Sequence, residues 1–290
     1  MTGGWNGGDY AAASDAWAHA ADHVTATALA ELGPTTAGPA PRVLDVATGT
    51  GTGPAALAAA RAGAAAVGLD GEPGLLRTAG ERARRAGLAA AARFVVGDAL
   101  ALPFPPGSFD TVLSTFGVMF APDARQVAAE LVRVCRPGGI VAVASWTPDG
   151  VMGRVAPTVT RHLDRPSAAP PPTRWGDPRH VRTWFAPLPV TLRTRIAHVR
   201  VTYPSVAHAV TVIENKPGPL RAHRSALQAL GRWDDAWADL AALFDAHNCS
   251  TGADLVFDAP CLLTVGRVHG PGRGGDSCQR RVAGAGPGRG

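Results

Sequence analysis

Five short apolar runs alternate with helical segments between residues 42 and 146, and this alternation constrains the fold more than any other feature of the chain. The runs expected to form strands are 42–47, 64–69, 93–96, 110–114 and 140–145. The segments expected to form helices between them are 54–62, 74–88 and 124–134, and the Pro- and Gly-containing residues 136–139 are expected to form a turn before the last strand. Uninterrupted apolar runs are typical of strands buried on both faces of a sheet, and strand–helix repeats of this spacing predict parallel βαβ units. The sequence therefore predicts an α/β fold with a doubly wound, Rossmann-like sheet.

The second half of the chain has a different pattern, with longer strands and more helices. Two segments, 190–203 and 254–268, are expected to be strands, which brings the predicted sheet to seven strands. The segments expected to be helices are 152–163, 177–185, 205–214, 220–230 and 234–248. These helices are expected to form insertions on the C-terminal side of the sheet.

The net charge of +5 and the pI of about 9.6 do not indicate a nucleic-acid partner. Residues 1–150 hold 10 basic and 13 acidic side chains, whereas residues 267–290 hold 5 and 1. That tail consists mostly of Gly, Arg and Pro, and we expect it to be disordered because it has too little apolar surface to bury. Residues 151–232 hold 13 basic and 3 acidic side chains, which either attract an acidic substrate or form a solvated face.

Cysteine spacing and apolar segments exclude several classes of protein. The four cysteines are scattered without a CxxC pair, which argues against a zinc site and against a secreted disulfide framework. No run approaches the roughly 20 apolar residues of a membrane span. The N-terminus lacks the basic start and apolar stretch of a signal peptide. We therefore expect a cytoplasmic protein with no metal and no membrane partner.

A glycine-rich turn follows the first expected strand, at the edge where open α/β sheets bind their ligands. The turn runs Asp45-Val-Ala-Thr-Gly-Thr-Gly-Thr-Gly53, and glycines there let the backbone approach a ligand closely. Residues 51–56 also match the dinucleotide fingerprint GxGxxA, so an NAD-dependent oxidoreductase is an alternative. Asp45 would repel a pyrophosphate but suits an ammonium group, which favours S-adenosylmethionine (SAM) over NAD.

Two further strands are followed by carboxylates. Asp70 ends the second strand and can accept both hydroxyls of a ribose, a property that fits NAD and SAM equally. Asp98 follows the third strand and can accept from an adenine amino group, while the Ala99 N–H can donate to the adenine ring. Three successive strand-end carboxylates together indicate a nucleoside cofactor more strongly than any one of them does alone.

Three stretches of this region have a specific order and spacing. They are Val43–Gly51 (VLDVATGTG), Gly97–Phe104 (GDALALPF) with Ser108–Val112 (SFDTV), and Arg133–Gly139 (RVCRPGG). Together they resemble the class I SAM-dependent methyltransferases, in particular the subfamily that includes the ubiquinone and menaquinone biosynthesis methyltransferases. The resemblance covers about residues 40–147. It departs at Ala47, which stands where the GxGxG motif of that family has its first glycine.

The resemblance implies that the chain binds SAM and releases S-adenosylhomocysteine (SAH). Asp70 would hold the ribose hydroxyls, Leu75 would pack on adenine, and Phe116 would pass beneath the cofactor near its methyl group. The implied cofactor-binding residues of the core are Asp45, Ala47, Gly49, Gly51, Asp70, Leu75, Asp98, Ala99, Thr115 and Phe116.

The resemblance also divides the chain into four parts. Residues 1–40 would be a helical lid, 41–150 the SAM-binding core, 151–266 the rest of the sheet with substrate-covering insertions, and 267–290 the tail. In the lid, Tyr10 and Trp17 are candidate neighbours of the sulfonium, because aromatic faces attract cations. The alternative is that both rings pack the lid helix onto the body.

No catalytic motif accompanies these residues, and direct displacement at a sulfonium depends mainly on alignment of the reactants. The weak candidates for a general base are His19, His162, His23 and His180. We expect a small organic acceptor of the quinone or secondary-metabolite type, methylated at O, N or C, and a monomer or homodimer. A non-catalytic partner subunit with this fold is a further alternative. Nucleic acid is not expected as a partner, because Ser114-Thr-Phe-Gly117 stands where base-flipping methyltransferases carry their base-holding motif.

Overall fold

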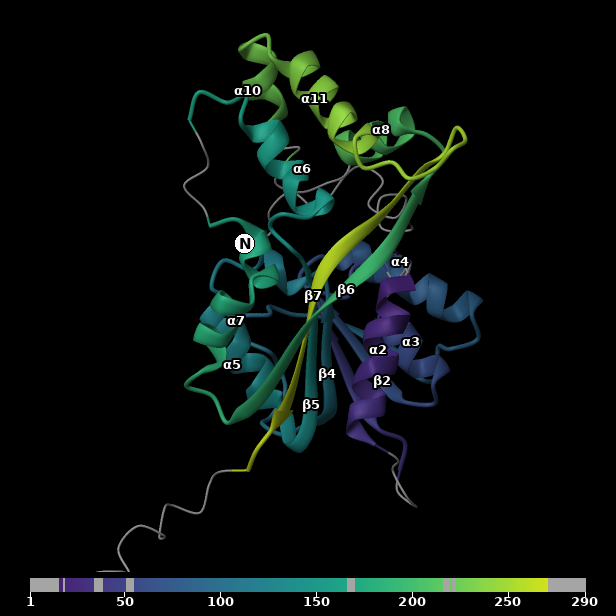
Figure 1. The fold of residues 1–290 in the computed structure, drawn as a ribbon. Helices are drawn as coiled ribbons and strands as arrows, with labels where there is room; N and C mark the ends of the chain where they lie inside the picture. Colours follow the sequence, from purple (N-terminus) through teal and green to yellow (C-terminus); the bar gives the residue numbers. More distant parts are fainter. Residues whose placement is uncertain are drawn as a thin grey trace, which may run out of the picture.

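Seven strands form one mixed sheet in the order β3-β2-β1-β4-β5-β7-β6, in a computed structural model that describes residues 16–17, 19–33, 39–50, 55–165, 170–215, 220 and 223–270 (Figure 1). The strands are β1 Arg42–Val46, β2 Ala65–Asp70, β3 Ala92–Val96, β4 Phe109–Thr115, β5 Cys135–Trp146, β6 Val190–Tyr203 and β7 Leu255–Val268. Strands β1 to β5 pair in parallel, and β7 runs antiparallel to both β5 and β6. The predicted doubly wound, seven-stranded α/β fold is confirmed.

The centre of the sheet is apolar on both faces, as the uninterrupted runs predict. Val43 and Leu44 of β1 and Val112 and Leu113 of β4 have no exposed surface. β1 and β4 lie side by side in parallel, with Leu44 opposite Val112. Helices connect the first strands of this core and bury both faces, which explains why the strands lack polar alternation.

Helices α2, α3 and α4 lie on one side of the sheet, and α5 and α7 lie on the other (Figure 1). Their bounds are α2 His19–Leu32, α3 Ala55–Arg61, α4 Pro73–Arg85, α5 Ala124–Val134 and α7 Pro178–Phe185. Two short 3₁₀ helices, η1 Val118–Phe120 and η2 Pro172–Gly176, lie near the ends of β4 and β5.

Part of the expected lid belongs to this helix layer. Ala20, Ala21, Val24 and Ala28 form a buried stripe along α2, and the helix packs against β4, β5 and α3. Because this stripe is buried on the sheet, residues 19–32 support the core and do not form a lid over its edge. Tyr10 lies outside the residues that the structure describes.

The remaining four helices form what we call the cap: α6 Val151–Thr160, α8 Val206–Asn215, α10 Arg224–Ala229 and α11 Trp233–Asp245. Helix α11 packs against the other three. The cap stands beyond the carboxyl ends of the parallel strands, at the top of Figure 1. No helix in the described part of the chain is long and apolar enough to cross a membrane.

Two local expectations were wrong at the ends of strands. Residues 136–139, expected as a turn, are included in β5, and the β4–β5 register shifts between Phe109 and Thr111 to accommodate them. The Arg136 guanidinium holds this stretch against the Asp110 carboxylate at 2.5 Å. Arg267 was included both in the expected strand 254–268 and at the start of the expected tail; it lies in β7, as the strand prediction has it, and donates to the carbonyl oxygens of Gly138 and Glu31.

Within the described residues, six of the 13 basic side chains in the stretch 151–232 form ion pairs. These pairs are Arg161–Asp239, Arg179–Asp177, Arg193–Glu31, Arg200–Asp258, Arg224–Glu214 and Arg232–Asp164. Half of these carboxylates come from α2, α11 or β7, which lie outside the stretch in sequence. Part of the positive charge counted along the sequence is therefore paired at separate sites on the fold.

The burial of the central strands gives a stability prediction. Replacing Leu113 with Ala removes a side chain that has no exposed surface. We expect the free energy of unfolding to fall by about 2–5 kcal/mol, the usual cost of such a cavity. Leu230→Ala, at a side chain 38% exposed, is the matched control and should cost far less in urea unfolding. Equal losses in the two variants would contradict the assignment of β4 to the core.

Candidate functional site

The loop that follows β1 is held in place by hydrogen bonds to the Asp45 side chain. Asp45 is buried, and its Oδ2 accepts hydrogen bonds from the Thr48 hydroxyl (2.6 Å) and the Ala56 N–H (3.1 Å). The first contact fixes the start of the glycine-rich loop, and the second fixes the first turn of α3. The sequence suggested Asp45 only as a partner for a ligand's ammonium group, whereas the structure also gives it this loop-holding role.

Asp70 at the end of β2 joins two strand ends through one carboxylate. Its Oδ2 accepts from the Gly49 N–H at 2.9 Å, and its Oδ1 accepts from the Glu72 N–H at 3.0 Å. Burial raises the pKa of Asp70, while these backbone hydrogen bonds act in the opposite direction. The carboxylate is thus fixed in position between the loop after β1 and the start of α4. Gly51 lies outside the described residues.

The ends of β1 and β4 are packed tightly together. A Cβ placed on Gly117 would lie 2.6 Å from both the Cβ and the carbonyl oxygen of Ala47. The Ser114 hydroxyl donates to the Val46 carbonyl at 2.8 Å and accepts from the Val118 N–H at 3.1 Å. Ala47 and Phe116 both adopt positive φ angles, 58° and 57°. Glycine adopts the left-handed φ found at Ala47 without strain, whereas an alanine there is strained.

An aromatic stack closes the ends of β4 and β5. The Phe116 ring stacks on Trp146 with centroids 3.7 Å apart and planes at 8°, and Trp17 meets Trp146 edge-on at 6.0 Å. Trp17 therefore packs on the body of the protein, which is the alternative to a place beside the sulfonium. Trp146 was not among the predicted site residues, although it occupies a strand end just as Asp45 and Asp70 do.

Thr115 lies beside this stack at the end of β4. Its Oγ1 is buried and forms no hydrogen bond within the described part of the chain. The Phe116 N–H, next along the chain, donates to the Ala144 carbonyl at 2.9 Å. The backbone next to Thr115 is therefore fixed, while the buried hydroxyl itself has no hydrogen-bond partner within the described ranges.

The loop after β3 carries Asp98 and Ala99 and begins next to Asp70. The Gly97 N–H donates to the Asp70 carbonyl at 3.0 Å, and the exposed Asp98 caps its own turn by accepting from the Leu100 N–H at 2.9 Å. Leu75, in the first turn of α4, is half-buried. The structure therefore brings Gly49, Asp70 and Asp98 to one edge of the sheet.

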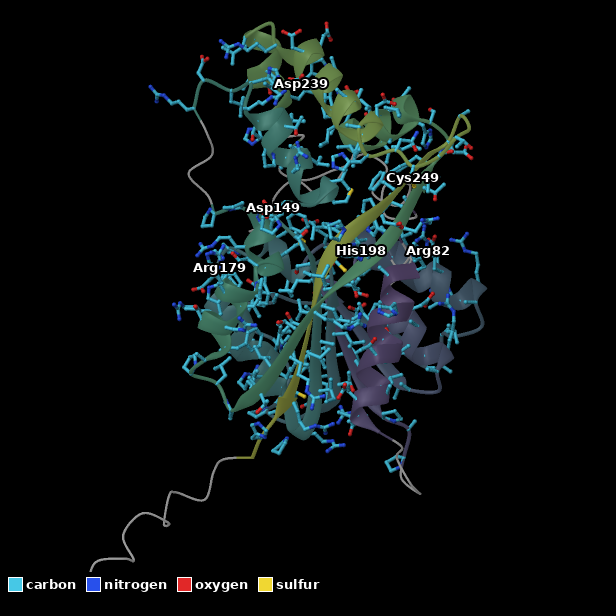
Figure 2. All side chains as sticks on the ribbon, viewed as in Figure 1. Arg82, Asp149, Arg179, His198, Asp239 and Cys249 are labelled. Carbon is cyan, nitrogen blue, oxygen red and sulfur yellow. The ribbon has the colours of Figure 1, made fainter. Side chains whose placement is uncertain are left out.

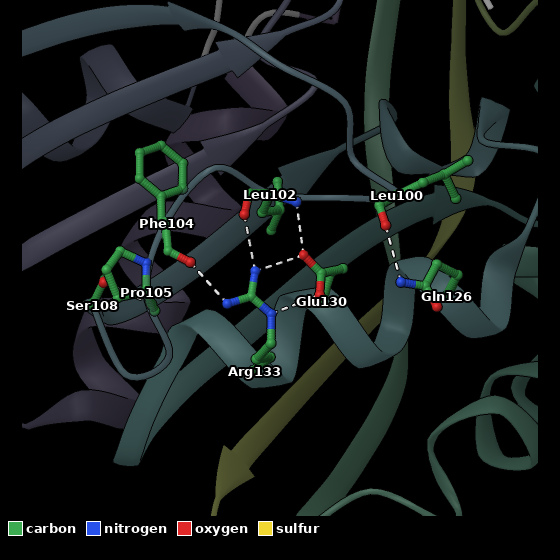
Figure 3. Close-up of polar contacts among 8 residues, drawn as sticks. All are labelled: Leu100, Leu102, Phe104, Pro105, Ser108, Gln126, Glu130 and Arg133. Carbon is green, nitrogen blue, oxygen red and sulfur yellow. Dashed lines mark hydrogen bonds and ion pairs between the residues drawn. The ribbon is translucent and has the colours of Figure 1, made fainter.

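A polar clasp on α5 holds this loop in place (Figure 3). Arg133 donates to the carbonyl oxygens of Leu102 and Phe104 at 2.9 and 2.8 Å, and it pairs with Glu130 at 2.6 Å. Glu130 in turn accepts from the Leu102 N–H at 2.7 Å. In the sequence, Arg133 stands out only as part of a motif. No sequence pattern indicates that Glu130 contacts a loop 28 residues away.

The candidate histidines lie in different parts of the fold. His162 contacts the Asp239 carboxylate at 2.6 Å and so joins α6 to α11 within the cap, where Figure 2 labels Asp239. His180 lies 3.3 Å from Asp177 at the start of α7, and His23 contacts Arg195 on β6. His19, at the start of α2, is exposed. A catalytic role for any of them stays a prediction.

No group of three or more His, Cys, Asp or Glu side chains within the described ranges is arranged to hold a metal ion. The chemistry available at the strand ends is that of carboxylates, backbone N–H groups, hydroxyl groups and aromatic rings.

Comparison with known families gives one domain match. Residues 44–143 match the methyltransferase domain family, and this range contains the last three residues of β1, all of β2 to β4 and all but the last three residues of β5. It therefore includes the carboxyl ends of β1 to β4, whereas Trp146 at the end of β5 lies just beyond it.

Comparisons with individual proteins agree with that match. An uncharacterized protein of Mycobacterium tuberculosis is 38% identical over 200 residues, which cover 66% of this chain and 71% of that protein. The demethylmenaquinone methyltransferase of Thermus thermophilus is 43% identical over 107 residues, 37% of this chain and about half (48%) of the enzyme. The crystal structure of YcgJ from Bacillus has the same fold, with a TM-score of 0.56 at 18% identity over 87% of this chain and 99% of that one.

The clasp on α5 gives a pH-dependent prediction. Replacing Arg133 with Ala leaves the buried Glu130 carboxylate without its guanidinium, and we expect a loss of about 2–3 kcal/mol in the free energy of unfolding near pH 7. Arg133 holds the pKa of Glu130 below its ordinary value of 4.5. The ionised carboxylate therefore contributes stability that is present above that value and is lost as pH falls through the folded pKa.

Chemical denaturation at several pH values tests this prediction. The difference between the wild type and Arg133→Ala should shrink as the solution becomes more acidic than about pH 4.5. Arg125→Ala, an exposed arginine on the same helix, should show no such pH dependence. A difference that stays constant down to low pH would contradict the role given to the Arg133–Glu130 pair.

The positive φ of Ala47 gives a second prediction. Ala47→Gly removes a left-handed strain of about 1–2 kcal/mol and adds about 0.5–1 kcal/mol of backbone entropy cost, so stability should stay equal or rise by up to about 1 kcal/mol. Ala47→Val should lower it by about 1–3 kcal/mol or more, because a β-branched residue is strained at this φ and Gly117 is in contact. Thermal unfolding compares the two. Destabilisation by Gly and tolerance of Val would contradict the strained loop.

Proposed function

Since this chain belongs to the class I SAM-dependent methyltransferases, we propose that it transfers the methyl group of SAM to O, N or C of a small organic acceptor. SAH is the other product. The observation that carries the proposal for this site is the fixed Asp70 carboxylate between the loop after β1 and the start of α4. The small acceptor is the only partner we propose, with neither nucleic acid nor a membrane. The protein acts in the cytoplasm as a monomer or homodimer.

The side chains at the strand ends fit the cofactor. An ionised carboxylate offers about four lone-pair positions, and the backbone N–H groups that donate to Asp70 are those of Gly49 and Glu72, with that of Gly71 also close enough to lower its pKa. Acceptor capacity that these donors leave on the two oxygens suits the adjacent hydroxyls of a ribose. Because the carboxylate is already oriented by the chain, ribose binding does not have to order it.

The other strand ends take the rest of the cofactor in this proposal. Asp98 and the Ala99 N–H meet the polar edge of adenine, and Leu75 packs against its face. Gly49, together with Asp45 and Ala47 in the same loop, lines the methionine and ribose part. Thr115 and Phe116 lie under the methyl group, where the Thr115 hydroxyl has no partner of its own.

SAM supplies an activated methyl group, and the residues of the chain position the two reactants. Transfer is a direct displacement, in which the acceptor attacks the methyl carbon from the side opposite the sulfur. Holding two reactants in line lowers a barrier by about 7–11 kcal/mol in favourable cases, so no dedicated catalytic side chain is required for every acceptor. The stacked rings of Phe116 and Trp146 give a rigid aromatic floor at this position.

A quinone or secondary-metabolite acceptor is the finer part of the proposal. It is supported by the similarity to a demethylmenaquinone methyltransferase over 107 residues, 37% of this chain. The cap, which has no counterpart in the matched range, is the part that would select the acceptor.

Asp70→Ala tests the cofactor site. The loss of hydrogen bonds to a charged group should weaken SAM and SAH binding by about 1.5–3 kcal/mol or more in titration calorimetry. Asp234→Ala, which removes an exposed carboxylate from α11, is the control and should leave the affinity unchanged. An unchanged affinity in Asp70→Ala, or tight binding of NADH without binding of SAM, would contradict the proposal.

The acceptor class is tested separately with SAM carrying a ¹³C-methyl group. Incubation with demethylated quinones and with small phenols, amines and acids should label at least one of them, as seen by mass spectrometry. Exclusive labelling of a protein or nucleic acid would contradict a small-molecule acceptor while leaving SAM binding intact.

A further inference from the structure

A pocket of about 470 Å³ lies between α2 and the β6 edge of the sheet, separate from the residues that the preceding sections assign to SAM. Its volume falls in the range of about 300–1,000 Å³ that is common for small-molecule sites. The floor consists of side chains of β5, β6 and β7 together with two small residues of α2: Ala144, Ala197, Val199, Cys261, Leu263, Ala20 and Val24. This floor is apolar, and burial raises the pKa of Cys261 to about 11, so its thiol is neutral.

The rim of the pocket is basic. Arg195, His19 and His23 are exposed and line it, and no acidic side chain is among the lining residues. The register places Arg195 opposite Leu263 and Leu263 opposite Ala144, so the Arg195 side chain stands on the same sheet face as that part of the floor. His198, labelled on β6 in Figure 2, also borders the pocket.

The Arg195 guanidinium is held in place without being neutralised. One of its nitrogens donates to the His23 Nε2 at 2.9 Å. Among the described residues, no carboxylate forms an ion pair with Arg195. The nearby acids are paired elsewhere: Asp22 with Arg61, Glu31 with Arg193, and Asp258 with Arg200.

We propose that this pocket is a second binding site that takes a small organic acid with an apolar body. The planar guanidinium of Arg195 suits a carboxylate, which it can bind through two parallel hydrogen bonds. The apolar body of the ligand lies on the buried floor between α2 and β7. The floor ends at Cys261, which is opposite Trp146 in the β5–β7 register. A ligand in the pocket therefore lies next to the Phe116–Trp146 stack. It does not contact the residues proposed to bind the cofactor.

Titration calorimetry on the full chain with octanoate tests the proposal, with 1-octanol as the neutral probe of equal length. Octanoate should bind at least about tenfold more tightly than 1-octanol, since a hydrogen bond to a charged group accounts for that factor or more. Arg195→Ala should remove this preference and weaken octanoate about tenfold. Arg193→Ala is the matched control, on the same strand but paired with Glu31, and should change the affinity less than twofold.

Ala197→Phe, which fills the floor while Arg195 stays intact, should also abolish octanoate binding. Circular dichroism shows whether each variant is folded, and SAH affinity should be unchanged in Arg195→Ala, which separates this site from the cofactor site. Absence of octanoate binding to the wild type, equal binding of octanoate and 1-octanol, or equal losses in Arg195→Ala and Arg193→Ala would each overturn the proposal.

Discussion

The Asp70 carboxylate is the contact on which the cofactor edge of the sheet depends. It accepts one backbone hydrogen bond from the loop after β1 and another from the start of α4, so a single buried anion fixes two strand ends relative to each other. Burial raises its pKa, and the N–H groups partly compensate by stabilising the charged form. Asp70 ends β2, at the edge where open α/β sheets bind ligands.

The second constraint is close packing at the ends of β1, β4 and β5. Ala47 and Gly117 touch, Phe116 is held in a left-handed conformation, and its ring stacks on Trp146. A Cβ on Gly176 would lie only 1.9 Å from the Trp146 carbonyl oxygen, so η2 packs directly against the backbone at the end of β5. The stack thus connects the start of α2, two strand ends and η2, and it fixes the floor under the proposed methyl position.

Much of the fold was predictable because the strands are short, apolar and uninterrupted. The alternation over residues 42–146 predicted β1 to β5 closely, and two long segments predicted β6 and β7. The error at 136–139 arose because Pro and Gly indicate a turn, whereas the Arg136–Asp110 contact holds these residues on β4. The role of residues 19–32 was also misjudged, because an alanine-rich helix gives no sign of which surface it covers.

The candidate site was predictable where residues follow strands and not where they act through distant contacts. Asp45, Asp70 and Asp98 were identified from their places in the sequence. The positive φ of Phe116, the Trp146 stack and the Glu130–Arg133 clasp depend on tertiary neighbours that no local pattern encodes. Likewise, the basic stretch 151–232 looked like one charged surface, whereas three of its arginines pair with carboxylates distant in sequence.

A crystal structure of the chain with SAH is the most direct test of the account. The account predicts that the ribose hydroxyls donate to Asp70, that the adenine edge meets Asp98 and the Ala99 N–H, and that the sulfur lies above Thr115 and Phe116. SAH bound elsewhere on the fold, or bound at this edge with its ribose turned away from Asp70, would contradict the account.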